Sequence, residues 1–260
     1  MKEETACEDM QVGETERAGE ETGGGAVGRA VCGNKRNYQK ALDRMLQTMP
    51  VGAHSLLLHS CCAPCSSYCM EYLREYFRIT VFFFNPNITE QAEYEKRAAE
   101  EKRLIAAYNK QVAEGCFAGM HSTQNAQRIE ILEGRYCPQD FYEMARGYEH
   151  CREGGERCLR CYEQRLRETA KTAADGGFDF FTTTLSISPL KNAAALNEIG
   201  GRLAEEYGVP YLFSDFKKKN GYKRSIELSA QFGLYRQDYC GCGYSKAERE
   251  RQKMECKKEI

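Results

Sequence analysis

Residues 56–65 read Leu-Leu-Leu-His-Ser-Cys-Cys-Ala-Pro-Cys, a short apolar run with three cysteines close behind it. Such a run, when a turn signal follows it, is typical of a buried strand. Ala63 and Pro64 indicate the turn, and helical spacing resumes over residues 66–77. We therefore predict a strand that delivers Cys61 and Cys62 to one edge of a sheet.

The rest of the chain alternates between strand-like and helix-like stretches. Aromatic and β-branched residues predict further strands at residues 79–84, 178–184 and 211–213. Helical spacing predicts helices at residues 37–49, 89–112, 140–148, 158–174, 192–207 and 222–232, and residues 115–137 show no clear period. Strands separated by helices favour a parallel sheet with right-handed crossovers, which binds ligands at the carboxyl ends of its strands. We predict one α/β domain at residues 37–245.

The two ends of the chain differ from this body. Residues 1–36 are acidic and glycine-rich, and they cannot bury enough apolar surface to offset the entropy of ordering, so we predict a disordered extension. Residues 1–24 hold eight acidic and two basic side chains, so the other 236 residues carry +5 although the whole chain carries −1. A mildly basic body is compatible with an anionic partner but does not require one. Residues 246–260 form a charged tail, either a solvated helix or a loose end.

The cysteines point to metal or redox chemistry. The chain has 14 of them in 260 residues, with no apolar secretory signal at the N-terminus and no apolar run that approaches a membrane span. We therefore expect a cytoplasmic protein without a membrane partner. Thiols stay reduced in the cytoplasm, where clustered cysteines indicate metal binding or redox chemistry more often than structural disulfides.

Four cysteines have the spacing of metal ligands. Cys158 and Cys161 form a Cys-x-x-Cys pair at the start of a predicted helix, whose N-terminal end favours thiolates. With Cys61 and Cys62 they provide the four sulfurs that tetrahedral zinc or a cubane iron–sulfur cluster requires. The spacing alone favours neither metal centre. The alternative is that cysteines act as small buried apolar side chains, which we expect of Cys69, Cys116, Cys137, Cys151 and Cys256.

Cys240 and Cys242 form a different kind of pair. A disulfide across the single residue Gly241 would close a small, strained ring that is easily reduced. We predict a redox-active pair. Two free surface thiols, or additional metal ligands, are the alternatives.

The sequence as a whole resembles a known family over residues 54–245. The motifs that carry the resemblance, in order along the chain, are HSCCAPC (59–65), FNPNI (84–88), GGERCLRC (154–161), FTTTLSISP (181–189), SDFKKKNGYKRS (214–225) and YRQDYCGC (235–242). They are similar to those of the epoxyqueuosine reductases of the QueH type. The acidic extension lies outside the match.

This resemblance implies a fold, a reaction and its cofactors. The fold would be a Rossmann-like sheet of the adenine-nucleotide α-hydrolase type with a helical Cys-rich insertion. The reaction would remove the epoxide oxygen from epoxyqueuosine at the tRNA wobble position, with two electrons from an unidentified donor, and yield queuosine. Cys61, Cys62, Cys158 and Cys161 would bind a [4Fe-4S] cluster, and Cys240 and Cys242 would form the redox-active disulfide. The family also leaves room for a second iron, for which Cys65 is a candidate ligand by position.

Other residues near the motifs are weaker candidates. His59, Asp238 and Tyr239 could donate or orient protons, although packing and surface roles explain them as well. A basic stretch could bind tRNA phosphates and stack on a base, and its candidate residues are Lys217, Lys218, Lys219, Tyr222, Lys223 and Arg224. The alternative for this stretch is a solvated loop that leads into a helix.

Two other functions compete with this interpretation. An ATP-dependent tRNA thiolation enzyme could use a related fold and a persulfide cysteine, but cysteines stand after the first strand where its glycine-rich phosphate loop would be. A zinc-binding module without catalysis would use the same cysteines and would be colourless.

Overall fold

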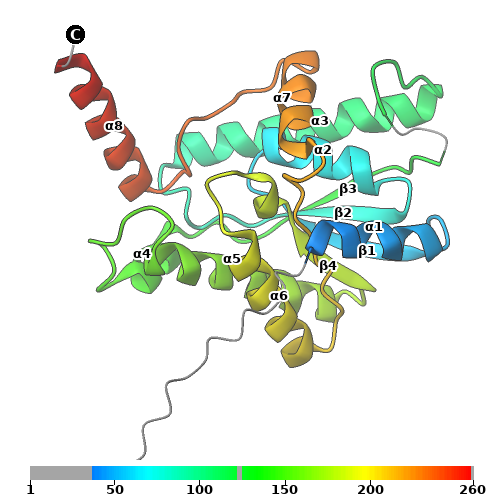
Figure 1. Ribbon diagram of the computed structural model, residues 1–260, viewed down its shortest axis with the longest axis horizontal. Helices are drawn as coiled ribbons and strands as arrows, with labels where there is room; N and C mark the ends of the chain where they lie inside the picture. The colour runs from blue at the N-terminus through cyan, green and yellow to red at the C-terminus, as the bar shows by residue number, and fades with distance from the viewer. Residues whose placement is uncertain (1–36, 122–124, 259–260) are drawn as a thin grey trace, which may run out of the picture. The chain divides into compact units, whose positions relative to one another are not determined.

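The computed structural model describes residues 37–121 and 125–258, so the predicted extension at residues 1–36 lies outside it, together with Cys7 and Cys32. Within the described residues the framework is a parallel sheet with the strand order β3-β2-β1-β4 (Figure 1). Its strands are β1 (His54–His59), β2 (Phe77–Phe83), β3 (Glu130–Glu133) and β4 (Phe180–Thr183). The predicted α/β class with a parallel sheet is confirmed.

Helices cover both faces of this sheet. They are α1 (Tyr38–Thr48), α2 (Ala63–Leu73), α3 (Gln91–Glu114), α4 (Pro138–Ala145), α5 (Glu156–Asp175), α6 (Ala193–Tyr207), α7 (Gly221–Gln231) and α8 (Gly243–Lys258), with a 3-10 turn η1 (Thr184–Ile187) after β4. The cysteine-rich insertion corresponds to α4 and the chain that leads into α5. No helix of the described chain has the length and apolar character needed to cross a bilayer.

Alternation along β1 builds the two halves of the core. Leu56 and Leu58 point to the face covered by α1, α2 and α3, whereas Leu57 points to the face covered by α5 and α6. All three leucines are fully buried. Consecutive residues of β1 are apolar because helices cover both faces of this strand, as they do in central strands of parallel sheets (Figure 1).

Several element boundaries differ from the prediction. α2 ends at Leu73, and Phe77 already opens β2, so the helix predicted over residues 66–77 was too long at its end. β3 lies in the stretch without a clear period. Residues 211–213 do not form a strand, because only Tyr211 pairs with Phe181 through an isolated bridge. α8 runs through position 245, where we placed the domain boundary, and gives the charged tail a helical form.

The strand order predicts where a ligand-binding crevice lies. β2 and β4 flank β1 on opposite sides, so the order of strands reverses beside β1. Ligands of open α/β sheets bind outside the carboxyl ends of the strands at such a switch point. Cys61 and Cys62 follow β1, and η1 follows β4, so both segments leave the sheet at this point.

Candidate metal and redox site

A pocket of about 370 Å³ opens at the switch point. Its wall includes Cys61 and Cys65, which come after β1, and Lys191, which comes after η1. Cys240 reaches the same pocket from the segment between α7 and α8. Three segments that are distant in the sequence therefore bring two groups of sulfur atoms to one cavity.

The first group consists of Cys61, Cys62 and Cys65, whose sulfurs lie within 4.8 Å of one another, close enough to hold a metal ion. Cys62 is the N-cap of α2 and has an extended backbone (φ −177°, ψ 154°), with Pro64 in the first turn. Because the chain turns here, the Sγ atoms of Cys61 and Cys62 are only 3.7 Å apart, whereas neighbours within a strand would point to opposite faces. The turn was predicted at Ala63 and Pro64, but these residues already open α2, and the chain bends just before them, at Cys61.

These three sulfurs share their charge unequally. Hydrogen bonds from Cys62 and Cys65 hold the pKa of Cys61 well below its usual range, and the charges of Arg165 and Lys191 act in the same direction. The hydrogen bond to Cys61 raises the pKa of Cys62 to about 12, and that of Cys65 is raised for the same reason. These hydrogen bonds thus favour the thiolate at Cys61 and the neutral thiol at Cys62 and Cys65. A cation would remove the protons that hold the other two sulfurs neutral.

Cys158 and Cys161 occupy the first two turns of α5, where the sequence placed them. The backbone N–H of Gly154 donates to the Sγ of Cys158 at 3.3 Å, and Cys158 packs against the apolar cluster that contains Cys61 and Cys62. Cys161 is buried, and burial raises its pKa to about 11. Among the described residues neither sulfur belongs to the group whose members lie within 4.8 Å.

The Cys240-Gly241-Cys242 turn is fastened on both sides. Gly241 has a φ of +112°, which residues other than glycine rarely adopt. Nη1 of Arg97 donates to the carbonyl oxygen of Cys240 at 3.1 Å, and the backbone N–H of Cys240 donates to Oγ of Ser245 at 3.1 Å. Both cysteines are free thiols in the structure, which therefore does not contain the predicted disulfide.

A buried guanidinium lies among these sulfurs. Arg165 is fully buried, and its Nη2 donates to Oδ1 of Asn85 at 2.8 Å. Burial by itself lowers the pKa of an arginine, but the pKa of Arg165 is raised overall by sulfur atoms, those of Cys161, Cys61 and Cys240. A buried cation beside several sulfurs fits a site in which a metal would bind those sulfurs as thiolates.

The candidate proton donors occupy different surroundings. His59 is fully buried, 2.8 Å from Oγ1 of Thr183, and burial together with Arg165 lowers its pKa to about 3, so the ring is neutral. It does not line the pocket, whereas Asp238 and Tyr239 do. Only the latter two can meet a ligand there.

Comparison with known proteins identifies the family. The family model described as "Epoxyqueuosine reductase QueH" matches residues 56–248. The chain belongs to this family. A Streptococcus pyogenes serotype M1 protein named epoxyqueuosine reductase QueH is 38% identical over 213 residues, which cover 81% of this chain and 78% of that protein. The Staphylococcus epidermidis protein of that name is 38% identical over 215 residues (81% and 85%), and the Thermotoga maritima protein is 33% identical over 201 residues (77% and 95%).

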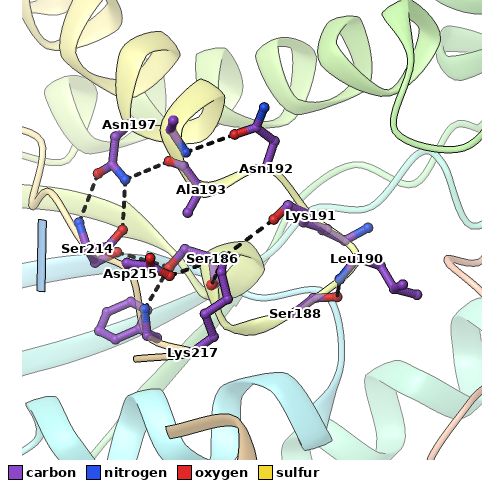
Figure 2. Close-up of polar contacts among 12 residues, drawn as sticks. Ser186, Ser188, Leu190, Lys191, Asn192, Ala193, Asn197, Ser214, Asp215 and Lys217 are labelled. Atoms are coloured by element: carbon purple, nitrogen blue, oxygen red, sulfur yellow. Dashed lines mark hydrogen bonds and ion pairs between the residues drawn. The ribbon is translucent and has the colours of Figure 1, made fainter. Parts of the chain in front are cut away.

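The QueH match contains the whole basic stretch at residues 217–224, and the structure divides its side chains into internally paired and exposed ones. Nζ of Lys217 pairs with Asp215 at 3.1 Å and donates to the backbone carbonyls of Ser186 and Lys191 (Figure 2). Arg224 is buried, and its Nη2 donates to Oε1 of Glu71 at 2.6 Å. Both side chains are committed within the protein. The other candidates are Lys219, which pairs with Asp43, exposed Lys218 and Lys223, and Tyr222, which lines the pocket.

Some QueH site residues escaped the sequence analysis. Arg165 lies four positions after Cys161 and seven after Cys158, so it shares their face of α5, and this spacing could have revealed it. Arg97 and Lys191 gave no such signal, because they meet Cys240 only through the fold. Two other expectations were wrong: Cys116 and Cys256 are exposed rather than buried, although Cys69 is fully buried as expected.

Proposed function

We propose that the protein reduces epoxyqueuosine in tRNA to queuosine in the pocket at the switch point. The QueH family assigns the chain to the reductases of queuosine biosynthesis. We locate the reaction in this pocket because Cys61 and Cys240, one from each sulfur group, line the same cavity. Opening the epoxide to an alkene takes two electrons and two protons and releases one water molecule. A shared cavity would let one bound nucleoside meet both the electron source and the redox pair.

The proposed cofactor is a [4Fe-4S] cluster bound by Cys61, Cys62, Cys158 and Cys161, which would supply electrons. The residues present fit such a group, because iron–sulfur clusters take thiolate ligands and Arg165 offers a buried positive charge beside these sulfurs. A cubane carries its irons at separate corners, so its four cysteine sulfurs need not crowd together as the ligands of one ion do. Cys65 completes the close group with Cys61 and Cys62, and it remains the candidate ligand for a second iron.

The chain's own residues would hold the substrate and move protons. Asp238 and Tyr239 are the proposed proton carriers, because both line the pocket and His59 does not. Cys240 and Cys242 are the proposed redox pair, alternating between the free thiols described above and a disulfide. An external two-electron donor would reduce the disulfide back to two thiols, with the uptake of two protons.

The proposed tRNA contacts are Lys218, Lys219, Tyr222 and Lys223. Tyr222 is 37% exposed and lines the pocket, where its ring could stack on a base. The lysines would meet phosphates, which need accessible cations. Lys217 and Arg224 are omitted because internal ion pairs hold them away from solvent, whereas Lys219 stays exposed although it pairs with Asp43. We place the reaction in the cytoplasm, where the thiols would stay reduced.

The test is anaerobic incubation of the full-length, iron-loaded protein with tRNA that contains epoxyqueuosine and a chemical reductant. Nucleoside mass spectrometry should detect queuosine without added ATP. Cys240→Ser should reduce conversion to background, and Cys116→Ser should convert as the unaltered chain does, because Cys116 is exposed and lines no part of the pocket. Absence of queuosine with the unaltered chain would contradict the proposal, and a requirement for ATP would favour a thiolation enzyme. A colourless protein with stoichiometric zinc would favour the non-catalytic zinc module.

A further inference from the structure

Lys191 places a positive charge on the redox pair. Its Nζ donates to the Sγ of Cys240 at 3.5 Å and lies 5.7 Å from the centre of the Tyr162 ring. Burial by itself lowers the pKa of a lysine, yet that of Lys191 is raised well above its usual range, with Cys240 as the leading cause and Tyr162 next. The side chain thus remains an ammonium ion and has a sulfur atom as its main counter-charge.

The two cysteines of the pair have different surroundings. Besides Lys191, Nδ2 of Asn87 donates to the Sγ of Cys240 at 3.8 Å, and Cys240 lines the pocket. The Sγ of Cys242 accepts from the backbone N–H of Ser245 at 3.4 Å, and Cys242 is only 5% exposed within an apolar cluster around Phe141. Only Cys240 combines access to the pocket with a cationic hydrogen-bond donor.

Hydrogen bonds hold the backbone on both sides of Lys191, so the side chain starts from a fixed position. The N–H of Lys191 donates to the carbonyl of Ser188 at 3.2 Å, and Lys217 donates to the carbonyl of Lys191 at 3.5 Å. Immediately afterwards Oδ1 of Asn192 accepts from the N–H of Ala194 at 3.0 Å and caps α6. Figure 2 shows the Lys191 side chain leaving this network, while its backbone carbonyl stays within it.

A second polar cluster fastens the loop that supports Lys217. Asn197 donates to the carbonyl of Ser214 at 2.7 Å and accepts from its N–H at 2.9 Å (Figure 2). Oγ of Ser186 lies 3.2 Å from that of Ser214, so the turn after β4 and the segment before α7 hold one another. Lys217, whose loop is held in this way, donates a hydrogen bond that helps to fix the backbone carbonyl of Lys191.

We propose that Lys191 is a positioning residue that makes Cys240, and not Cys242, the reactive sulfur of the pair. The inference rests on the proposed function only in treating the two cysteines as a redox pair. Its content is chemical: the ammonium of Lys191 stabilises the thiolate of Cys240, and a thiolate is the nucleophilic form of cysteine.

Lys191 is one of several groups around Cys240 that favour its thiolate. The pKa of Cys240 is held well below its usual range by the hydrogen bond from Cys242, then by the charges of Lys191 and Arg165, while burial and Cys61 oppose the shift. Arg97 reaches only the carbonyl oxygen of Cys240. Lys191 is the cation that donates to the sulfur itself.

The test measures alkylation of each cysteine in the full-length, iron-loaded, reduced protein. Iodoacetamide forms a sulfur–carbon bond with a thiolate and releases iodide, and peptide mass spectrometry reports Cys240 and Cys242 separately. In the unaltered chain we expect Cys240 to react first, with an inflection below the ordinary thiol pKa of about 8.5. Lys191→Met should raise the pH of this inflection by about one unit, which lowers the rate at Cys240 about tenfold at pH values below the inflection.

Two further variants separate charge from structure. Lys191→Arg retains a cation and should restore most of the rate. Lys171→Met removes an equal charge from an exposed position on α5, about three turns beyond Cys161, and should leave the rate unchanged. Circular dichroism and iron content verify that each variant is folded and loaded.

Two results would overturn the inference. The first concerns the unaltered chain, so it does not depend on whether a variant folds. It would be faster labelling of Cys242 than of Cys240, or an inflection for Cys240 at the ordinary thiol pKa. The other is an unchanged inflection for Cys240 in folded Lys191→Met. Because labelling requires no epoxyqueuosine, these results are independent of whether the protein converts tRNA.

Discussion

Arg224 of α7 forms a buried ion pair with Glu71 of α2, in which Nη2 and Oε1 are 2.6 Å apart. Nε of Arg224 donates to the other carboxylate oxygen at 2.9 Å, so the pair is bidentate. Glu71 also accepts from the backbone N–H of His121 at 3.0 Å. The pair therefore joins α2, which begins just after the cysteine turn, to α7, whose first turn contains the end of the basic stretch.

Removing one member of this pair should destabilise the fold. Arg224→Met leaves the carboxylate of Glu71 buried without its cation, which costs about 3–5 kcal/mol for a buried pair. Thermal unfolding should report a lower midpoint, and the double variant Glu71→Gln with Arg224→Met should recover part of the loss. If Arg224→Met and Lys223→Met had equal midpoints, the ion pair would not support the fold as described.

Iron binding should depend on the cysteines of α5 and not on exposed ones. We expect Cys158→Ala to lose bound iron and activity, because Cys158 is a proposed cluster ligand. Cys116→Ala should keep both, since Cys116 is exposed at the end of α3. Iron analysis and the absorbance near 400 nm measure the first property, and equal iron content in the two variants would contradict the ligand assignment.

Glu101 should make the stability of the fold depend on pH. It is fully buried, Oγ of Ser66 donates to it at 2.6 Å, and burial raises its pKa to about 7. Since its ordinary pKa is 4.5, the folded chain binds more protons than the unfolded chain between these values, and stability falls as pH rises through this window. The loss should approach about 3 kcal/mol above pH 7.

Glu101→Gln removes this titration. Denaturant unfolding between pH 4.5 and pH 8 should therefore give a flatter stability curve for the variant than for the unaltered chain. Two parallel curves would mean that the carboxyl of Glu101 is not held neutral by its surroundings.

The exposed lysines of the basic stretch should contribute to tRNA affinity through phosphate contacts. Replacing Lys218 or Lys223 by Glu should weaken binding, and each lost contact should reduce the salt dependence of log K by about one. The matched control is Lys171→Glu on α5, whose affinity should not change. Filter binding at several salt concentrations measures both properties, and an unchanged slope would exclude phosphate contacts by these lysines.

The sequence predicted those parts of the fold that depend on local patterns. Leu56, Leu57 and Leu58 identified a strand because both of its faces are covered, and Cys158 and Cys161 identified a helix start because they begin a regular apolar spacing. β3 was not predicted, because it is a four-residue edge strand without buried side chains and therefore has little apolar signal. Residues 211–213 have the composition of a strand, but only Tyr211 pairs with a strand residue, Phe181. The same side chain packs in the apolar cluster that includes α6.

The site was predictable only where chemistry follows the order of the chain. The cysteine motifs named the sulfur groups, and helical spacing from Cys161 leads to Arg165, but Arg97 and Lys191 reach the sulfurs from other segments. A single sequence does not tell which arginine or lysine will be buried beside a thiol. Lys217 and Arg224 illustrate the reverse error, since a basic stretch looks uniformly solvated until the fold draws two of its members inward.

The guanidinium of Arg165 has a consequence for how the protein matures. It is enclosed in the interior, and it depends on neighbouring sulfurs for its counter-charge. Charged sulfurs are supplied in full only when a metal displaces their protons. If the proposed cluster binds these sulfurs, a newly synthesised chain without it lacks part of this counter-charge, and we expect it to unfold and be degraded sooner than a chain that holds the cluster. Turnover in the cell would then remove inactive copies without a dedicated sensor.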